Sequence, residues 1–528
     1  MIQKQPEAER SGPPVLSAAT RRKGLEGLGD EPIDLVVIGA GVTGTGIALD
    51  AASRGLRTVV LEAHDLAFGT SRWSSKLAHG GLRYLASGDI GIAHRSAVER
   101  GILAEHTAPH LVRPLAQVVP VFKGAGPGAL LPRIGFLAGD VLSRLAGTPS
   151  SILPRSRTVS AARTAELVPG VRRDGLRAGF VNWDCQLIDD ARLVTSLART
   201  AAAHGASVLT RCRVDSATGD EVTFTDTRSD EAHTISARAV ISATGVWAGS
   251  LSSTIRVRPS RGTHLVVDAA TLGHPTGALT VPVPGSNSRF CFCLPVENGR
   301  VFVGLTDVDA DGQIPDVPAS DDDEVDFLLD VVSRALRRPL TRADVLGTFA
   351  GLRPLIDGGE SGQTSDLSRR HAIVADPSGL ITVTGGKLTE YRLMAEQAVD
   401  EVVRARGLVA GDCMTTRLPL VGARGEDRLP AADARELPSQ LPASLVARFG
   451  TEASGVVASS LLERPLEAVA EGLDVTRAEF SFACTHEGAL DEDDILDRRS
   501  RIGLVAADRD AALPAAREAV TAAASAGR

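Results

Sequence analysis

A glycine-rich turn near residue 40 limits the possible folds of this chain more than any other segment. An apolar, β-branched run at 34–38 precedes Gly39, Gly41 and Gly44, which have G-x-G-x-x-G spacing, and an apolar helical pattern follows. A second strand-like run then ends at Glu62, about twenty residues further on. Gly39 permits the tight turn, Gly41 lets backbone N–H groups approach a pyrophosphate, and Gly44 lets helix and strand pack closely. The pattern predicts a dinucleotide-binding βαβ unit, with Glu62 accepting from the ribose hydroxyls of an adenosine.

The composition is typical of a globular enzyme with two or three domains. The chain has 528 residues, of which 43% are hydrophobic and 23% charged. The net charge of −8 argues against non-specific nucleic-acid binding. Only five residues are lysine, so a lysine deep in the chain, such as Lys387, needs a reason beyond composition.

Cysteine usage and the absence of targeting signals indicate a thiol-reduced, cytoplasmic protein. The six cysteines are scattered, with no C-x-x-C pair and no histidine cluster at metal spacing, so no metal site is expected. Cys291 and Cys293 alternate in an apparent strand and are expected to be core residues on one face. Residues 1–30 are polar and are predicted to be a disordered leader. No apolar run is long enough to span a membrane, which leaves peripheral binding at the inner face of the cell membrane.

Polar residues are concentrated immediately after the second strand, in residues 68–84. Residues of this kind in a loop usually carry function, although a capped helix start with exposed polar groups is the alternative. The candidate cofactor-binding residues in this loop are Thr70, Ser71, Ser74, Ser75, His79, Gly80 and Gly81.

The nucleotide domain is predicted to be completed late in the chain. An apolar strand at 239–243 leads to Thr244 and Gly245, and a β-branched run at 380–384 leads to a second glycine-rich helix start, Gly385-Gly386-Lys387-Leu388. Between about 255 and 350 the pattern changes to short alternating strands, which predicts an inserted antiparallel sheet carrying the substrate. From 411 to 528 the chain is Ala-rich and indicates a small helical domain. The fold class is therefore α/β, a Rossmann-type domain at 31–410 assembled from early and late segments.

Residues 109–150 are apolar, rich in Pro and Gly, and contain dispersed basic residues. Within them, residues 130–142 have two interpretations of equal weight. The segment either lies on a membrane surface or forms an ordinary buried connection.

Several motifs together resemble FAD-dependent glycerol-3-phosphate dehydrogenase. The most specific is Ser74-Ser75-Lys76-Leu77-Ala78-His79-Gly80-Gly81-Leu82-Arg83-Tyr84. The others are the glycine turn, residues 304–307, 351–355 and 385–389, and the likeness runs from about 32 to 405 and into the C-terminal domain. The segment ending in Ala243-Thr244-Gly245 also resembles the second FAD-contacting strand of two-dinucleotide-type flavoproteins. Arg72-Trp73 are bulkier than is usual in the family, and Glu390 stands where the family commonly has Thr.

The resemblance implies oxidation of sn-glycerol 3-phosphate to dihydroxyacetone phosphate, with FAD reduced and then reoxidised by a quinone. Holding a phosphate dianion needs convergent cations, and Arg suits this task because its planar fork makes paired hydrogen bonds. The residues at the family's substrate positions are Arg83, Tyr84, Arg353, Arg369 and Lys387. Proton removal favours a histidine, either His264, which is slightly preferred, or His79. A membrane surface and a second copy of the chain are further candidate partners.

Three rival functions remain open from the sequence. One is a sarcosine- or amino-acid-oxidising flavoenzyme of the same fold, although a carboxylate substrate does not need so many cations. Another is a glycerol-3-phosphate oxidase that passes electrons to oxygen. The third is an inactive flavin-binding scaffold, which the bulky Arg72-Trp73 pair slightly favours.

Overall fold

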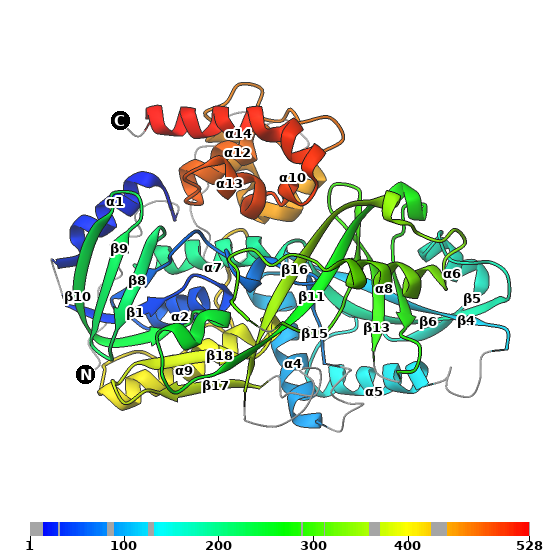
Figure 1. The fold of residues 1–528 in the computed structure, drawn as a ribbon, viewed down its shortest axis with the longest axis horizontal. Helices are drawn as coiled ribbons and strands as arrows, with labels where there is room; N and C mark the ends of the chain where they lie inside the picture. Colours follow the sequence, from blue (N-terminus) through cyan, green and yellow to red (C-terminus); the bar gives the residue numbers. More distant parts are fainter. Residues whose placement is uncertain are drawn as a thin grey trace.

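The computed structural model describes residues 14–29, 32–81, 89–124, 131–286, 289–310, 312–357, 370–423 and 441–526. Two sheets lie side by side, and helices from the end of the chain form a separate group above them (Figure 1). Three expected substrate residues, Arg83, Tyr84 and Arg369, lie outside the described residues.

The first sheet is the expected nucleotide-binding sheet, and it is built from early and late segments of the chain. Its order is β17-β18-β10-β1-β2-β7, and all neighbours except β17 and β18 pair in parallel. The strands are β1 (Ile33–Ile38), β2 (Thr58–Leu61), β7 (Ser207–Leu209), β10 (Glu231–Ser242), β17 (His371–Ala375) and β18 (Ile381–Gly385), and β8 (Cys212–Ala217) and β9 (Glu221–Asp226) extend it at β10. The β1 strand is buried along almost its whole length, as expected for a parallel strand covered on both faces.

Three helices pack together in the apolar core of one face of this sheet. They are α2 (Val42–Ser53), α7 (Asp190–Ala203) and α9 (Tyr391–Arg406). The opposite face is covered by β8, β9 and residues next to α1. The α1 helix (Ala18–Glu26) shows that the prediction of a disordered leader is wrong for residues 14–29, because Arg21 is buried and its Nη2 lies 2.7 Å from Oδ1 of Asp226. A surface helix anchored by one buried ion pair carries little hydrophobic signal in the sequence.

The second sheet is mainly antiparallel and larger than predicted. Its order is β15-β11-β14-β13-β12-β4-β6-β3, with β16 beside β11 and β5 beside β6. The strands are β3 (Leu77–Ala78), β4 (Val112–Phe122), β5 (Arg157–Ser160), β6 (Leu176–Leu187), β11 (Val257–Asp268), β12 (Ala278–Pro282), β13 (Phe290–Val296), β14 (Arg300–Gly304), β15 (Val308–Asp309) and β16 (Val345–Ile356). The expected bounds of about 255–350 therefore miss β4 and β6. The α6 (Ala161–Leu167) and α8 (Asp322–Ser333) helices cover one face, where Cys291 and Cys293 are buried as predicted.

Residues 130–142, to which the two interpretations given above apply, lie almost entirely in α5 (Leu131–Leu145), an exposed amphipathic helix, so the interpretation as a buried connection is wrong for residues 131–142. The β4 strand, earlier within residues 109–150, is a buried part of the sheet. Leu142 of α5 packs on α4 (Ile90–Ile102), which continues as a wider helical turn over Leu103–Thr107.

The C-terminal residues form a helical unit, at the top of Figure 1. Its helices are α10 (Ala443–Phe449), α11 (Ala453–Ala458), α12 (Arg477–His486), α13 (Glu492–Asp494) and α14 (Ala506–Ala526). These helices have their own apolar cores. Among the described residues, no helix combines the length and the apolar character needed to cross a membrane.

Candidate functional site

The glycine turn after β1 has the close packing that its spacing predicts. Gly39 has φ of +101°, a conformation that favours glycine, and a Cβ there would lie 2.8 Å from the carbonyl oxygen of Ala243. A Cβ on Gly44 would lie 1.8 Å from the carbonyl oxygen of Gly39, so no side chain fits between helix and turn.

The N-terminus of α2 is open to an anion. Its N-cap, Gly41, provides no side-chain hydrogen bond, and a Cβ there would have only the Oγ of Ser71 within 4 Å, at 3.0 Å. The backbone N–H of Val42 donates to that Oγ at 2.9 Å. The turn and the following loop thus meet at the end of the helix, where free N–H groups and the dipole favour a pyrophosphate.

Glu62 lies at the end of β2 beside this turn. Its Oε2 accepts from the N–H of Ala40 at 2.7 Å and its Oε1 accepts from the N–H of His64 at 2.9 Å. Burial raises the pKa of Glu62. The carboxylate is therefore fixed by the backbone at the position where the sequence placed a ribose contact.

The loop after β2 is held by contacts to distant segments. Thr70 Oγ1 donates to the carbonyl of Leu352 on β16 at 2.6 Å, and the N–H of Ser74 donates to Asp190 at 2.9 Å. Lys76 is buried and its Nζ donates to Asp190 Oδ1 at 2.5 Å. Burial lowers the pKa of Lys76; it opposes ionisation of Asp190 as well, but the charges of Lys76 and Arg501 outweigh it and lower that pKa. The sequence analysis missed this pair, although the rarity of lysine was a signal for it.

The end of the loop packs on β6 and α4. The N–H of Gly80 donates to Asp184 Oδ1 at 3.2 Å, and a Cβ on Gly80 would lie 2.2 Å from Nη1 of Arg100. Arg100 in turn pairs with Asp184 at 2.8 Å. Gly81 has φ of +78°, and His79 is half-buried and makes contacts of its own.

Two predicted site residues from different segments meet directly. Ser75 Oγ lies 2.8 Å from Nε2 of His264 on β11. The His264 ring is buried and stacks on Phe349, with 4.7 Å between centroids. Burial, together with the charges of Arg353 and Lys76, lowers the pKa of His264 to about 3, so its imidazole is neutral at pH 7.

Arg353 lies on β16, which pairs with β11, the strand that carries His264. Its Nη1 donates to Ser260 Oγ at 3.2 Å and to Asp307 Oδ1 at 3.3 Å. A Cβ on Gly262 would lie 2.4 Å from Nη2 of Arg353, so the guanidinium extends across the strand two residues from His264. The side chain is 22% exposed and is positioned by an acidic partner.

The glycine-rich segment at the end of β18, residues 385–388, forms the side of the site that belongs to the nucleotide sheet. Gly385 and Gly386 have φ of +78° and +77°, and Lys387 and Leu388 follow at the short helical turn Leu388–Glu390 before α9. Lys387 Nζ donates to Ser96 Oγ at 2.8 Å and to Glu390 Oε1 at 3.2 Å. Glu390, the departure from the family pattern, is thus a buried partner of Lys387.

Thr244 and Gly245 lie beside this segment at the end of β10. Gly245 has φ of +59°, and its carbonyl accepts a hydrogen bond from Thr384 at 3.3 Å. Of the cations expected at the phosphate, Arg353 and Lys387 are described. Each is held by an acidic neighbour and also has further interactions.

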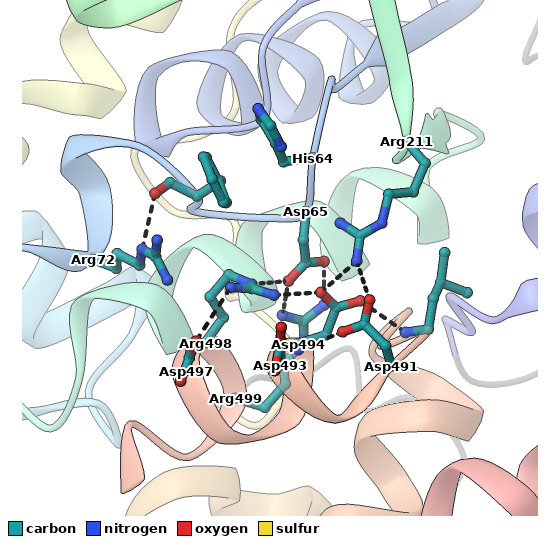
Figure 2. A network of polar contacts seen from close by, with 12 residues as sticks. His64, Asp65, Arg72, Arg211, Asp491, Asp493, Asp494, Asp497, Arg498 and Arg499 are labelled. Carbon is teal, nitrogen blue, oxygen red and sulfur yellow. Dashed lines mark hydrogen bonds and ion pairs between the residues drawn. The ribbon is translucent and has the colours of Figure 1, made fainter. Parts of the chain in front are cut away.

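The C-terminal helical unit contacts the start of the loop that follows β2, residues 62–81, which is called the flavin loop below; the sequence did not indicate this contact. Arg498 and Arg499 both reach the carboxylate of Asp65 (Figure 2). Arg498 donates to it at 2.6 Å, and Arg499 donates at 2.8 and 2.9 Å. Burial opposes ionisation of Asp65, but the two arginines outweigh it and lower its pKa. Arg72 lies near the same cluster and stacks over Trp73 at 4.3 Å, so the bulky Arg72-Trp73 pair is packed internally.

Comparisons with known proteins agree with this architecture. Residues 34–392 match the family model of FAD dependent oxidoreductases, and residues 413–526 match that of the C-terminal domain of alpha-glycerophosphate oxidase. A Mycobacterium bovis protein, glycerol-3-phosphate dehydrogenase 1, is 55% identical over 509 residues, covering 96% of this chain and 98% of its own length. The chain belongs to the FAD-dependent glycerol-3-phosphate dehydrogenase family.

Two further similar proteins have lower sequence identity to this chain. D-erythritol 1-phosphate dehydrogenase of Brucella abortus is 34% identical over 494 residues, covering 89% of this chain and 94% of its own. The crystal structure of glycerol-3-phosphate dehydrogenase from Bacillus halodurans, complexed with FAD, has a TM-score of 0.69 at 26% identity, over 96% of this chain and 94% of that one.

The cofactor of this family is FAD, and the described residues fit it. At the N-terminus of α2, the turn through Gly39, Gly41 and Gly44 brings no side chain of its own, and Glu62 lies beside this turn, as the predicted pyrophosphate and ribose contacts require. The family to which the chain belongs and its FAD cofactor confirm the predictions made from the sequence motifs.

Proposed function

We propose that the protein oxidises sn-glycerol 3-phosphate to dihydroxyacetone phosphate and passes the electrons to a quinone. The 55% identity to a glycerol-3-phosphate dehydrogenase over nearly the full chain supports the substrate. The observation that carries the proposal is the contact between Ser75 of the flavin loop and His264, with Arg353 on the neighbouring strand. This contact places the candidate base, His264, and the candidate phosphate-binding cation, Arg353, next to the flavin loop.

The chain's part in the reaction is to hold the phosphate and to move one proton. Arg353 and Lys387, with Arg83, Tyr84 and Arg369, bind the phosphate of the substrate. The turn at Gly39, Gly41 and Gly44 would hold FAD, which would supply N5 as the acceptor of the hydride from C2 of the substrate. The substrate hydroxyl loses its proton to His264, with His79 contacting flavin or substrate; His79 is the alternative base.

The electrostatics of His264 support a link between binding and proton transfer. Its low pKa comes first from burial and then from the charge of Arg353. A phosphate dianion at Arg353 offsets that charge and raises the proton affinity of His264. The imidazole therefore becomes a better base only when substrate is present.

The quinone and the membrane are the remaining parts of the proposal. The α5 helix exposes Leu131, Ile134, Leu137, Val141 and Leu145, which supports peripheral binding at the inner face of the cell membrane.

We assign residues 31–410 to the FAD-binding domain with the inserted sheet and residues 411–528 to the helical domain. We also propose that the protein forms a homodimer, and light scattering of the purified protein tests this.

The test is an absorption spectrum of the purified, FAD-loaded protein with and without substrate. We expect glycerol 3-phosphate to bleach the flavin band, and sarcosine to leave it unchanged. D-Erythritol 1-phosphate, the substrate in the name of one relative, is the matched phosphate control. Faster bleaching by that compound or by sarcosine contradicts the proposed substrate, peroxide formed under air identifies an oxidase, and no bleaching by any of these compounds identifies an inactive scaffold.

A further inference from the structure

A buried lysine follows the serine that contacts His264. Lys76 is 2% exposed, and its backbone has φ of +58°, a conformation that residues with a side chain rarely adopt. Its ammonium donates to Asp190 Oδ1 at 2.5 Å and to the carbonyl of Arg72 at 3.1 Å. An unusual backbone conformation persists only where the surroundings fix it, and these two contacts fix it here.

The carboxylate of Asp190 holds the flavin loop on both sides of Ser75. Its Oδ2 accepts from the N–H of Ser74 at 2.9 Å, and its Oδ1 accepts from the ammonium of Lys76. Asp190 is fully buried and is the first residue of α7, so it is itself held by a rigid element. The two neighbours of Ser75 in the chain are therefore fixed to one carboxylate.

The C-terminal helical unit provides a second cation at the same place. Arg501 precedes the short helical turn Ile502–Leu504, and its Nη2 donates to the carbonyl of Arg72 at 2.7 Å. Its guanidinium lies 4.8 Å from the centroid of the Trp73 ring, and the residue is 9% exposed. The carbonyl of Arg72 thus accepts hydrogen bonds from one cation of the flavin loop and one cation of the helical unit.

The same two segments also reach the aromatic ring against which His264 packs. The imidazole stacks on Phe349, with 4.7 Å between centroids, and Lys76 Nζ lies 5.8 Å from the centroid of that ring. Val505, which ends the turn after Arg501, is buried in one apolar cluster with Phe349. The hydroxyl and the ring that contact His264 are therefore both supported by these segments.

The charges of the lysine and its partner act on His264 in opposite directions. The charge of Lys76 lowers the pKa of His264, as that of Arg353 does, whereas the charge of Asp190 raises it. An ion pair thus holds the loop with little net charge beside the base, which a lone buried cation could not do.

We propose that Lys76 and Arg501 are positioning residues for proton transfer. By fixing the backbone before and after Ser75, they place its Oγ against Nε2 of His264. The inference rests on the proposed function, in which His264 accepts the substrate proton. It gives the helical unit a part in the reaction, because Arg501 acts on the base through the flavin loop.

The test follows bleaching of the flavin in the full-length, FAD-loaded enzyme by glycerol 3-phosphate without an acceptor. We expect Lys76→Met and Arg501→Gln each to slow bleaching at saturating substrate roughly 5-fold or more, since each removes buried hydrogen bonds of a charged group. The substrate concentration that gives half the maximal rate should change less than about two-fold, because neither residue is placed at the phosphate.

The matched control is Arg199→Gln. Arg199 lies on α7, as Asp190 does, and forms a buried ion pair with Glu452 of the helical unit at 2.7 Å. The variant therefore weakens the same interface at a distance from the flavin loop, and it should bleach at the wild-type rate. A loss in Arg199→Gln equal to that in Arg501→Gln would overturn the proposal.

A double-mutant cycle separates positioning from general support of the fold. If Lys76 acts through Ser75, the double variant Ser75→Ala/Lys76→Met should be about as slow as Ser75→Ala alone. Losses that multiply would show that Lys76 acts independently and would overturn its role. Should Lys76→Met fail to bind flavin, the cycle of Ser75→Ala with Arg501→Gln decides the point in the same way, since Arg501 lies outside the flavin loop.

The wild type shows which of the two proposals has failed. If glycerol 3-phosphate does not bleach the wild type, the proposed function is wrong, whatever the variants do. If the wild type is bleached and both Lys76→Met and Arg501→Gln match its rate, only the positioning role is wrong.

Discussion

Ser75 and His264, 189 residues apart in sequence, are joined by a 2.8 Å hydrogen bond between Oγ and Nε2. The bond fixes the flavin loop against the large sheet and orients a buried imidazole. Ser75→Ala should lower kcat of the flavin-loaded enzyme, because it leaves that nitrogen without its side-chain partner. The cost of about 1–3 kcal/mol corresponds to a roughly 5- to 150-fold loss. The control Ser53→Ala removes a serine whose bond is to its own helix, and an equal loss there would contradict the assignment.

Arg353 is expected to bind the substrate phosphate. Arg353→Ala should raise KM for glycerol 3-phosphate, with a loss in kcat/KM of about 10- to 150-fold, since charge-assisted hydrogen bonds contribute about 1.5–3 kcal/mol. Flavin content, measured from the absorption spectrum, should not change. Arg258→Ala on β11 is the control, because Arg258 forms an ion pair with Asp309 at the partly exposed end of the same sheet. An unchanged KM in Arg353→Ala would remove this residue from the phosphate site.

Two glycines of the same turn should respond differently to substitution. Gly41→Val should give a folded but colourless protein, since the new side chain meets only Ser71 and fills the place of the pyrophosphate. Gly44→Ala should prevent folding, because its Cβ would overlap the carbonyl of Gly39. Circular dichroism and flavin absorbance distinguish the two outcomes, and a yellow Gly41→Val protein would refute the cofactor assignment.

Asp65 connects the flavin loop to the C-terminal helices (Figure 2). Asp65→Asn should lower the free energy of unfolding by about 3 kcal/mol, since it leaves Arg498 and Arg499 buried without their shared carboxylate. Thermal unfolding of the variant should show a lower Tm. In limited proteolysis, its C-terminal unit should be cleaved earlier than that of the wild type. Asp493→Asn, whose side chain is 64% exposed and pairs with Arg509, should change stability by less than about 1 kcal/mol.

Acid should destabilise the protein well above the pKa of ordinary carboxylates. Burial lowers the pKa of His110 and His486 to about 4 and, with nearby charges, that of His264 to about 3. Between these values and 6.5 the unfolded chain binds more protons than the folded chain, so stability falls as pH falls. We expect the denaturant midpoint to decrease from pH 7 to pH 6, with a loss of up to about 1.4 kcal/mol per pH unit for each such group, whereas below pH 6 the pKa of Asp494, which burial raises to about 6, acts in the opposite direction. His486→Gln should make this dependence shallower, and an identical slope would exclude His486.

The nucleotide sheet was predictable because its signals are local. The run before Gly39, the spacing of Gly41 and Gly44, and the late Gly385-Gly386 pair each determine a strand, a turn or a helix start through steric requirements of a few neighbouring residues. The size of the second sheet was not predictable in the same way. The β4 and β6 strands precede the expected insertion by many residues, and their pairing depends on contacts between distant segments.

By itself, the sequence determined the dinucleotide turn, the split nucleotide domain, the family and the identity of the candidate residues. Only the tertiary structure decided which groups meet: Ser75 with His264, Lys387 with Ser96 and Asp65 with the C-terminal arginines. It also decided that α5 presents its apolar face to solvent. The reason is that steric rules act between neighbours in the chain, whereas ion pairs, burial and pKa values depend on groups that folding brings together from hundreds of residues apart.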